Sequence, residues 1–241
     1  GITEIKFHNY KISKDRTAVK DENLSPIRQM AIPTTVTEVK AFLGCTGQMA
    51  NYCQWYALVA APLHALTKKS TVFPKPWLKG TDYDIAFWRL KSMMLDEPLF
   101  LWNKVSNKRL FVEVDSSQEG WGACVYQYAK EAPADEEDEG RYRLTDRTPK
   151  RIIQWISKAH TPHEKSLPCF YRETLARLLS LEYFRNLIET QNPKAGTTVY
   201  TDHLPSVKEA SLSNKGQLST WRIHETADLN SIVQTLHRKG A

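Results

Sequence analysis

The stretch VEVDSSQEGWGACVYQ, residues 112–127, decides the fold expected for this chain. It begins with an apolar run that delivers Asp115 at its end, and a second apolar run follows after a short polar turn. TVYTDHL (198–204) repeats the first half of this pattern, because it also closes an apolar run with an aspartate, Asp202. Runs of this length and composition are typical of buried strands, so both acids are expected at strand ends.

A third acid stands on a predicted helix. CFYRETLARLLSL (169–181) has the apolar spacing of an amphipathic helix and is expected to carry Glu173 in its first turn. Three carboxylates that converge from two strand ends and a helix suit hard divalent cations, and a pair of metals on such a site cuts phosphodiester bonds. The acids lie 58 and 29 residues apart along the chain, so only a folded domain brings them together.

The composition is that of an ordinary globular protein with a basic surplus. The 241 residues, 41% hydrophobic and 25% charged, are enough for one large or two small domains. The net charge is +6, and it would be +12 without the six acids of the run EAPADEEDEG at 131–140. A basic body fits a nucleic-acid partner, although a merely basic soluble protein has the same balance. The acidic run is interpreted as a solvated, mobile loop, or alternatively as a mimic of nucleic acid or a partner contact.

Cysteine spacing and hydropathy restrict the cellular compartments in which the chain is expected. The four cysteines form no CxxC pair, so structural zinc and a disulfide framework are not expected. A reducing compartment, cytoplasmic or nuclear, fits this usage, and an organelle is also compatible. No apolar stretch approaches the roughly 20 residues of a membrane span, and there is no signal-peptide pattern, so no membrane partner is expected. Because the first residue is Gly, we expect a processed product or an excised piece of something longer.

The first hundred residues change from strand-like to helical texture. Weak alternation in residues 1–30 predicts a short hairpin or edge strand. Thr35 and Glu38 have the spacing of a capping box and predict a helix that ends near Gly44. Further helices are predicted at 48–60, 62–69 and 82–98. The last of these is expected to start at an Asp82 cap and to turn Ile85, Trp88 and Met93 toward the core.

The second half reads as strands around one strong helix. Strands are predicted at 109–114, 121–127, 151–157, 197–201 and 231–237, with a helix at 173–188 and a partly helical segment at 211–228. The order is therefore β-β-β-α-β-α-β, and the acidic run falls in the loop between the second and third strands.

This order, with its acids at two strand ends and in the first helix, is that of the ribonuclease H fold. The local sequences resemble gypsy-like LTR-retrotransposon reverse transcriptases. Residues 112–127 resemble the family segment TDAS-x-x-G-x-GAVL-x-Q. YRETLA (171–176) is similar to ERELLA, and YTDHLPSV (200–207) is similar to TDHKAL. The resemblance implies an α/β fold with a mixed five-stranded sheet and flanking helices.

The resemblance continues upstream. Residues 32–69 resemble the thumb of these enzymes, through the pattern P-x-T-x-x-E-x-x-x-FLG and the later A-x-PL-x-x-L-x-x-K, and FHNYKISKD (7–15) resembles the strand that ends the palm. The implied organisation is a remnant of the palm edge at 1–24, a helical thumb-like domain at 25–103 and a ribonuclease H-like domain at 104–241.

Departures from the family limit what the chain is expected to do. A Y-x-D-D turn for polymerisation is absent, and Asp115-Ser116-Ser117 lacks the glycine of a D-[ST]-G protease turn. The family's fourth acid lies in a helix beyond the last strand, and this sequence stops at Ala241, where that helix should begin. Asp228 precedes the strand and is not assigned the role. Three of four acids are therefore present.

The implied activity is hydrolysis of the RNA strand of an RNA–DNA hybrid. Asp115, Glu173 and Asp202 would act as catalytic residues and hold two Mg²⁺ ions, with Mn²⁺ as a substitute. The hybrid would be recognised by its shape and by the 2′-OH of the RNA. The remaining partner would be the rest of the reverse transcriptase or a larger assembly.

Other side chains have weaker indications. Contacts to the hybrid are expected from a set of basic and aromatic residues: Lys40, Tyr52, Trp55, Lys68, Lys69 and His203. Simpler interpretations stand beside these. Glu173 could serve the helix dipole, and Tyr52 and Trp55 could pack between helices. His203 and His160 could be ordinary surface or strand-end residues. The tryptophans Trp121, Trp155 and Trp221 are expected to pack in the core.

Two further hypotheses stay open at the level of the sequence. The chain could be a noncatalytic retroelement remnant retained as a structural subunit, as the missing palm and fourth acid would allow. It could also be a cut piece of a full polymerase. A following N-x-x-AD-x-L segment would restore the nuclease, and a preceding Y-x-D-D turn would restore the polymerase.

Overall fold

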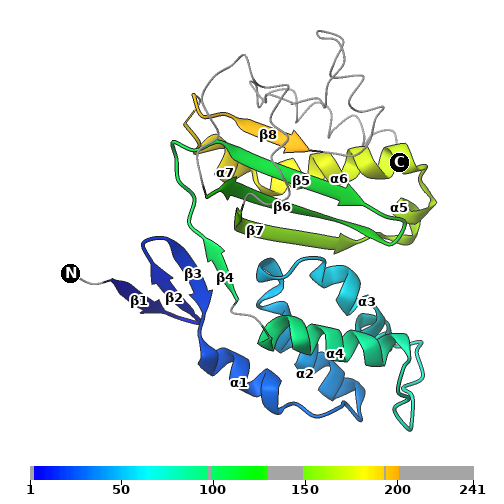
Figure 1. The fold of residues 1–241 in the computed structure, drawn as a ribbon. Helices are drawn as coiled ribbons and strands as arrows, with labels where there is room; N and C mark the ends of the chain where they lie inside the picture. Colours follow the sequence, from blue (N-terminus) through cyan, green and yellow to red (C-terminus); the bar gives the residue numbers. More distant parts are fainter. Residues whose placement is uncertain (1–2, 97–98, 130–148, 193, 201–241) are drawn as a thin grey trace. The chain divides into compact units, whose positions relative to one another are not determined.

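The computed structural model describes residues 3–96, 99–129, 149–192 and 194–200 (Figure 1). These residues belong to two compact units. The first unit comprises the chain up to Asn103 together with Gln154–His160, and the second comprises Lys104–Ile153 and the chain from Thr161 on. The strand β7 (Lys150–Ala159) contributes residues to both. The segments predicted at 211–228 and 231–237 lie outside the described residues.

An antiparallel sheet opens the first unit. Its strands are β1 (Glu4–Phe7), β2 (Tyr10–Ser13), β3 (Arg16–Val19) and β4 (Phe100–Trp102), in that order across the sheet. The sequence predicted one hairpin or edge strand here, whereas the structure has a sheet of four strands. Two-residue connections join the first three strands, and in the first of them His8 takes a left-handed backbone (φ 46°), which suits a tight hairpin turn.

Four α-helices form the core of the first unit. They are α1 (Asp21–Gln29), α2 (Val36–Gly47), α3 (Tyr56–Leu66) and α4 (Asp82–Leu95), with a 3₁₀ turn η1 (Ala50–Tyr52) between α2 and α3. Their apolar faces enclose fully buried side chains such as Phe42, Leu63 and Phe87. The cap predicted at Thr35 is confirmed, because the Glu38 backbone N–H donates to the Thr35 hydroxyl over 3.2 Å.

The structure corrects three helix boundaries. Helix α2 passes the exposed Gly44 and ends at Gly47, and the buried Thr46 beyond Gly44 donates its hydroxyl to the carbonyl of Phe42. Helix α3 spans the predicted break between 48–60 and 62–69 with Pro62 inside it, since a proline removes only one hydrogen bond of the helix. In helix α4 the cap is Thr81 rather than Asp82.

The buried face of α4 also differs from the prediction. Ile85 and Trp88 are 54% and 49% exposed. The buried face instead carries Phe87, Leu90 and Met94, which are fully buried and repeat at helical spacing. The sequence offers two overlapping apolar stripes on this helix, and packing against α3 selects one of them.

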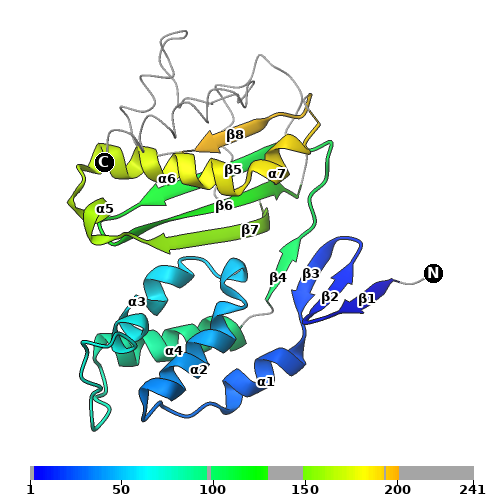
Figure 2. The same ribbon diagram turned by 180° about the vertical axis from the view of Figure 1, so that it is seen from behind.

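The second unit is a mixed sheet with helices on one face. The described strands β5 (Leu110–Ser116), β6 (Gly120–Tyr128), β7 and β8 (Thr197–Tyr200) lie in the order β7-β6-β5-β8. Strand β5 pairs antiparallel with β6 and parallel with β8. The helices α6 (Cys169–Tyr183) and α7 (Arg185–Glu189) cover one face, as the two opposite views show (Figures 1 and 2). The predicted mixed α/β fold is confirmed.

Two local features of this unit differ from the prediction. The helix expected at 173–188 begins earlier, at Cys169, and breaks at Phe184, whose fully buried ring anchors the join of α6 and α7. A short helix α5 (Pro162–Ser166) precedes it, with a capping box between Thr161 and Glu164. Trp121 is buried as predicted, Trp155 is half-buried and Trp221 lies outside the described residues.

One buried glutamine holds the segment that precedes β5 against the sheet. Gln127 on β6 accepts from the backbone N–H of Val105 (2.9 Å) and donates to the carbonyls of Val105 (2.8 Å) and Lys108 (2.7 Å). Its amide therefore satisfies backbone groups that no strand pairs. Within the described ranges, no helix is both long enough and apolar enough to cross a membrane.

Candidate functional site

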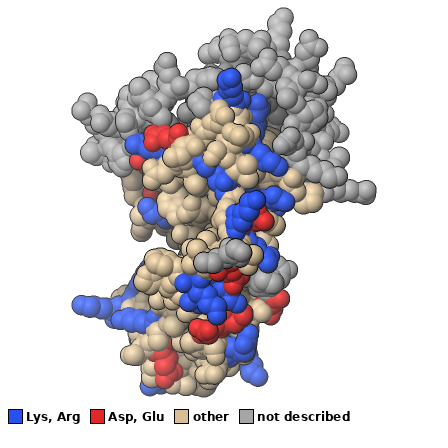
Figure 3. Space-filling view, turned by 90° about the vertical axis from the view of Figure 1, so that its left-hand side faces the viewer, with Lys and Arg blue, Asp and Glu red and all other residues tan. Residues whose placement is uncertain are grey.

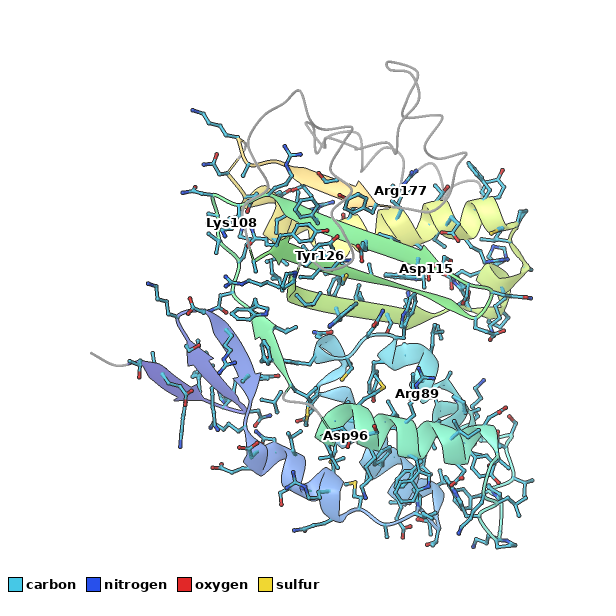
Figure 4. The ribbon with its side chains drawn as sticks, in the orientation of Figure 1. Arg89, Asp96, Lys108, Asp115, Tyr126 and Arg177 are labelled. Atoms are coloured by element: carbon cyan, nitrogen blue, oxygen red, sulfur yellow. The ribbon has the colours of Figure 1, made fainter. Side chains whose placement is uncertain are left out.

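Asp115 lies near the end of the central strand of the second unit. The preceding side chains Val112 and Val114 are buried, whereas Asp115 is exposed. Strand β6 pairs with β5 as far as Asp115 and Ser116, and β8 pairs with the preceding residues Leu110 to Glu113. The pairing partner of Asp115 on β6 is Gly122, and Figure 4 shows Asp115 on the sheet of the second unit.

Glu173 is a buried carboxylate on α6. It is the fifth residue of this helix and is 7% exposed. The prediction that it lies in the first turn was wrong, because the helix starts four residues earlier than expected. This position also weighs against a role in stabilising the helix dipole, an effect that is confined to the first turn. Glu173 instead shares the inward face of α6 with Ala176 and Ser180, and α6 packs on β5.

The third predicted acid, Asp202, lies outside the described residues, as does His203. Strand β8, which precedes them, is described as far as Tyr200 and pairs there with Glu113 of β5. Within the described ranges, no three His, Cys, Asp or Glu side chains form a group that could hold a metal. The two described acids supply carboxylate oxygens, the donor type that hard divalent cations take in proteins.

The turn after Asp115 is well ordered. The Ser117 hydroxyl accepts from the backbone N–H groups of Glu119 (3.2 Å) and Gly120 (3.3 Å) and closes the β5–β6 connection. The Glu119 carboxylate pairs with the ammonium of Lys165 on α5. Helix α5 and the turn are thereby joined at the end of β5 where Asp115 stands.

A second carboxylate on β5 has a different environment. Glu113 precedes Asp115 by two residues, so both side chains leave the strand on the same face. Its Oε1 atom accepts hydrogen bonds from the Tyr126 hydroxyl (2.8 Å) and from the Lys150 ammonium of β7 (2.5 Å). The Lys150 nitrogen also lies 4.7 Å from the centre of the Tyr126 ring.

Burial and this network shift the pKa values of the groups in it. Burial, assisted by the bonds to Tyr128 and Glu113, raises the pKa of the Tyr126 hydroxyl far above its ordinary value. Burial also raises the pKa of the Cys124 thiol to about 12. For Lys150, burial alone would lower the pKa, but the hydrogen bond and charge of Glu113 outweigh it and raise the pKa. Glu113 and Lys150 are therefore held as an ion pair, which the sequence prediction missed.

The predicted nucleic-acid contacts of the first unit fall into two groups. Lys40, Lys68 and Lys69 are exposed. Tyr52 stacks on Tyr10, with ring centres 5.8 Å apart, and burial raises its pKa to about 12. Trp55 is half-buried at the start of α3 with a left-handed backbone (φ 58°). The two aromatic residues therefore serve packing, at least in part.

Basic side chains do not gather in one patch on the face shown in Figure 3. Lys and Arg are spread over the visible surface, with Asp and Glu between them. On this face, charge alone does not mark a path for a polyanion.

Comparison with known proteins defines the class. Residues 105–225 match the family described as RNase H-like domain found in reverse transcriptase. This match and the fold together mark the second unit as a ribonuclease H-like domain of a retroelement. The chain belongs to this family of RNase H-like domains found in reverse transcriptases.

Relatives extend the similarity over most of the chain. The retrovirus-related Pol polyprotein from transposon opus of Drosophila melanogaster is 28% identical over 211 residues, which is 84% of this chain and 19% of that protein. The Pol polyprotein from transposon 297 of the same organism is 24% identical over 91% of this chain and 18% of its own length. The Gag-Pol polyprotein of baboon endogenous virus is 30% identical over 40% of the chain and 5% of its length. The chain spans about a fifth or less of these relatives.

Solved structures support the fold. A foamy viral protease-reverse transcriptase in complex with dsDNA has a TM-score of 0.62 at 14% identity and covers 98% of this chain and 43% of its own. The same viral enzyme in complex with an RNA/DNA hybrid has a TM-score of 0.61 at 13% identity, over 97% and 28%. The RNase H-like fold class predicted for this chain is therefore confirmed.

Proposed function

We propose that this chain is the ribonuclease H region of a gypsy-like retrotransposon Pol polyprotein, and that it hydrolyses the RNA strand of RNA–DNA hybrids with divalent cations. The family match and the transposon relatives support the setting. A viral reverse transcriptase of similar fold has been solved with an RNA/DNA hybrid, which supports the substrate class.

One observation carries the assignment of the site. In the parallel pairing of β5 with β8, Glu113 is the partner of Tyr200. Asp115 and Asp202 each follow two residues later along these chain directions. Asp115 thus lies just beyond the last described pair of β5 and β8, and Glu173 lies on the helix that packs on β5. We therefore assign Asp115, Glu173 and Asp202 as the metal-binding and catalytic acids.

These residues have separate tasks in the proposed mechanism. A bound pair of Mg²⁺ ions, or Mn²⁺ in their place, would activate a water molecule and stabilise the leaving 3′ oxygen. Asp115 stands on β5, which has a neighbouring strand on each side, and its exposed carboxylate would face the cations and the substrate. Glu173 would supply its oxygens from a buried position, where less water competes for them.

We further propose that residues 1–24 are the edge of a palm and 25–103 a thumb-like domain. The transposon relatives match 84% and 91% of the chain, which is more than the nuclease region alone. The exposed amines of Lys40, Lys68 and Lys69 are available to phosphates of the hybrid. His203, also proposed as a contact, lies outside the described residues. Because the rings of Tyr52 and Trp55 are half-buried, each would contact a base or sugar with at most one edge of the ring.

Cleavage of a labelled RNA–DNA hybrid in Mg²⁺ tests the function. The Asp115→Asn variant is expected to lose activity by roughly 10²-fold or more, because a group that holds the catalytic charge is removed. Glu189→Gln is a matched control, since it neutralises an exposed carboxylate on α7. Single-stranded RNA and duplex DNA should not be cut. Equal cleavage by the wild type and Asp115→Asn would refute the proposal, and so would no cleavage by the wild type in either Mg²⁺ or Mn²⁺.

A further inference from the structure

The face of β5 that carries Asp115 also carries Glu113, an acid whose charge is balanced by Lys150. Glu113 and Asp115 are two residues apart on one strand, so their Cβ atoms lie roughly 7 Å apart. The Glu113 carboxylate is 40% exposed and so is the Lys150 side chain with which it pairs. Neither charge is fully screened by solvent at this distance from Asp115.

The pair is held in place by more than its own attraction. The Tyr126 ring is fully buried and stacks on Phe111, with centres 5.5 Å apart. Its hydroxyl donates to the same Glu113 oxygen that Lys150 contacts, and its ring face supports the Lys150 ammonium. The other carboxylate oxygen lies 4.0 Å from the Cys124 sulfur. The network thus fixes both charges on the sheet.

We propose that Lys150 is a positioning residue that neutralises Glu113 and thereby limits the affinity of the neighbouring cation site at Asp115. The inference rests on the proposed function, because it concerns the cations that function requires. Without Lys150, a full negative charge would stand beside Asp115 and draw cations more tightly. Without Glu113, the charge of Lys150 would stand alone and repel them. With both neutralised, the affinity should return to near the wild-type value.

The test measures Mn²⁺ binding by the full chain, with free Mn²⁺ followed by electron paramagnetic resonance. Lys150→Met should tighten binding about three- to tenfold, as one unit of charge at this distance allows. Glu113→Gln keeps an acceptor for Tyr126 and should weaken binding by a similar factor. The double variant should bind within about twofold of the wild type.

Lys194→Met is the matched control. It removes the same charge at an exposed position next to Ala195 and Gly196, where Gly196 accepts from the backbone of Leu110 at the start of β5. Asp115 lies five residues further along this strand, roughly 16 Å away, so the affinity should be unchanged.

The outcomes separate this inference from the proposed function. If Asp115→Asn binds Mn²⁺ as tightly as the wild type, the proposed function fails. If that variant loses binding but Lys150→Met and Glu113→Gln both match the wild type, only the inference fails. Circular dichroism reports whether each variant is folded. If Lys150→Met does not fold, Glu113→Gln decides alone, and unchanged or tighter binding by it overturns the inference.

Discussion

Single side chains around β5 differ in whether they serve stability or chemistry. The Tyr126 hydroxyl is buried and donates to Glu113, so Tyr126→Phe removes a hydrogen bond to a charged group. We expect it to lower the free energy of unfolding by about 1.5–3 kcal/mol, since bonds to ions are worth more than neutral ones. Urea denaturation measures this loss. Tyr171→Phe, at an exposed position of α6, is the control and should change little.

At the residue scale the sequence predicted isolated acids better than networks. Asp115 could be found because it closes an apolar run, and its exposure agrees with that interpretation. The pairing of Glu113 with Lys150 could not be found, because it depends on β7 lying beside β6 with a particular register, 37 residues away along the chain. Of the two residues, only Glu113 could have been noticed in the sequence, because its spacing of two residues from Asp115 places both acids on one face of the strand.

At the scale of elements, the cap of α2 gives a direct prediction. Thr35→Ala removes the acceptor for the Glu38 backbone N–H and should destabilise the first unit by about 1 kcal/mol. Thr37→Ala makes the same change at an exposed position inside the helix and should be neutral or slightly stabilising. Thermal denaturation of both variants checks this. Equal stability of the two would show that the cap contributes nothing.

The sequence predicted that these helices exist, but not the residues at which they end. The capping spacing located the start of α2, because it depends on local hydrogen bonds. Gly44 and Pro62 were misread as breaks, since tertiary packing of their neighbours outweighs the modest local cost of either residue. The exposed stripe of Ile85 and Trp88 on α4 shows the same limit for burial.

For the whole molecule, binding of a cation should appear as added stability. A ligand that binds only the folded state at ten times its Kd stabilises it by about 1.4 kcal/mol. Mg²⁺ at that concentration should therefore raise the unfolding midpoint of the wild type, and the rise should vanish in Asp115→Asn. Differential scanning calorimetry measures this rise, with protein from which Ca²⁺ and other cations have first been removed by EDTA treatment. A rise of equal size in the variant would place the cation elsewhere.

The order of elements in the second unit was predicted as far as the structure describes it, because alternating apolar runs and one amphipathic helix suffice for that purpose. The two units, each with its own core, could not be delimited from periodicity alone, since residues 154–160 group with the first unit.

The parallel pairing of β5 with β8 also has a consequence for synthesis. Leu110 pairs with Thr197, so β5 leaves the ribosome 87 residues before its second neighbour. At about 5–20 residues per second, one edge of β5 stays open for on the order of ten seconds. An open edge invites pairing with a second nascent chain, and charged side chains discourage it. Lys150 precedes β8 in the chain and compensates Glu113, so Asp115 is the acid that leaves a negative charge on this strand to discourage such pairing.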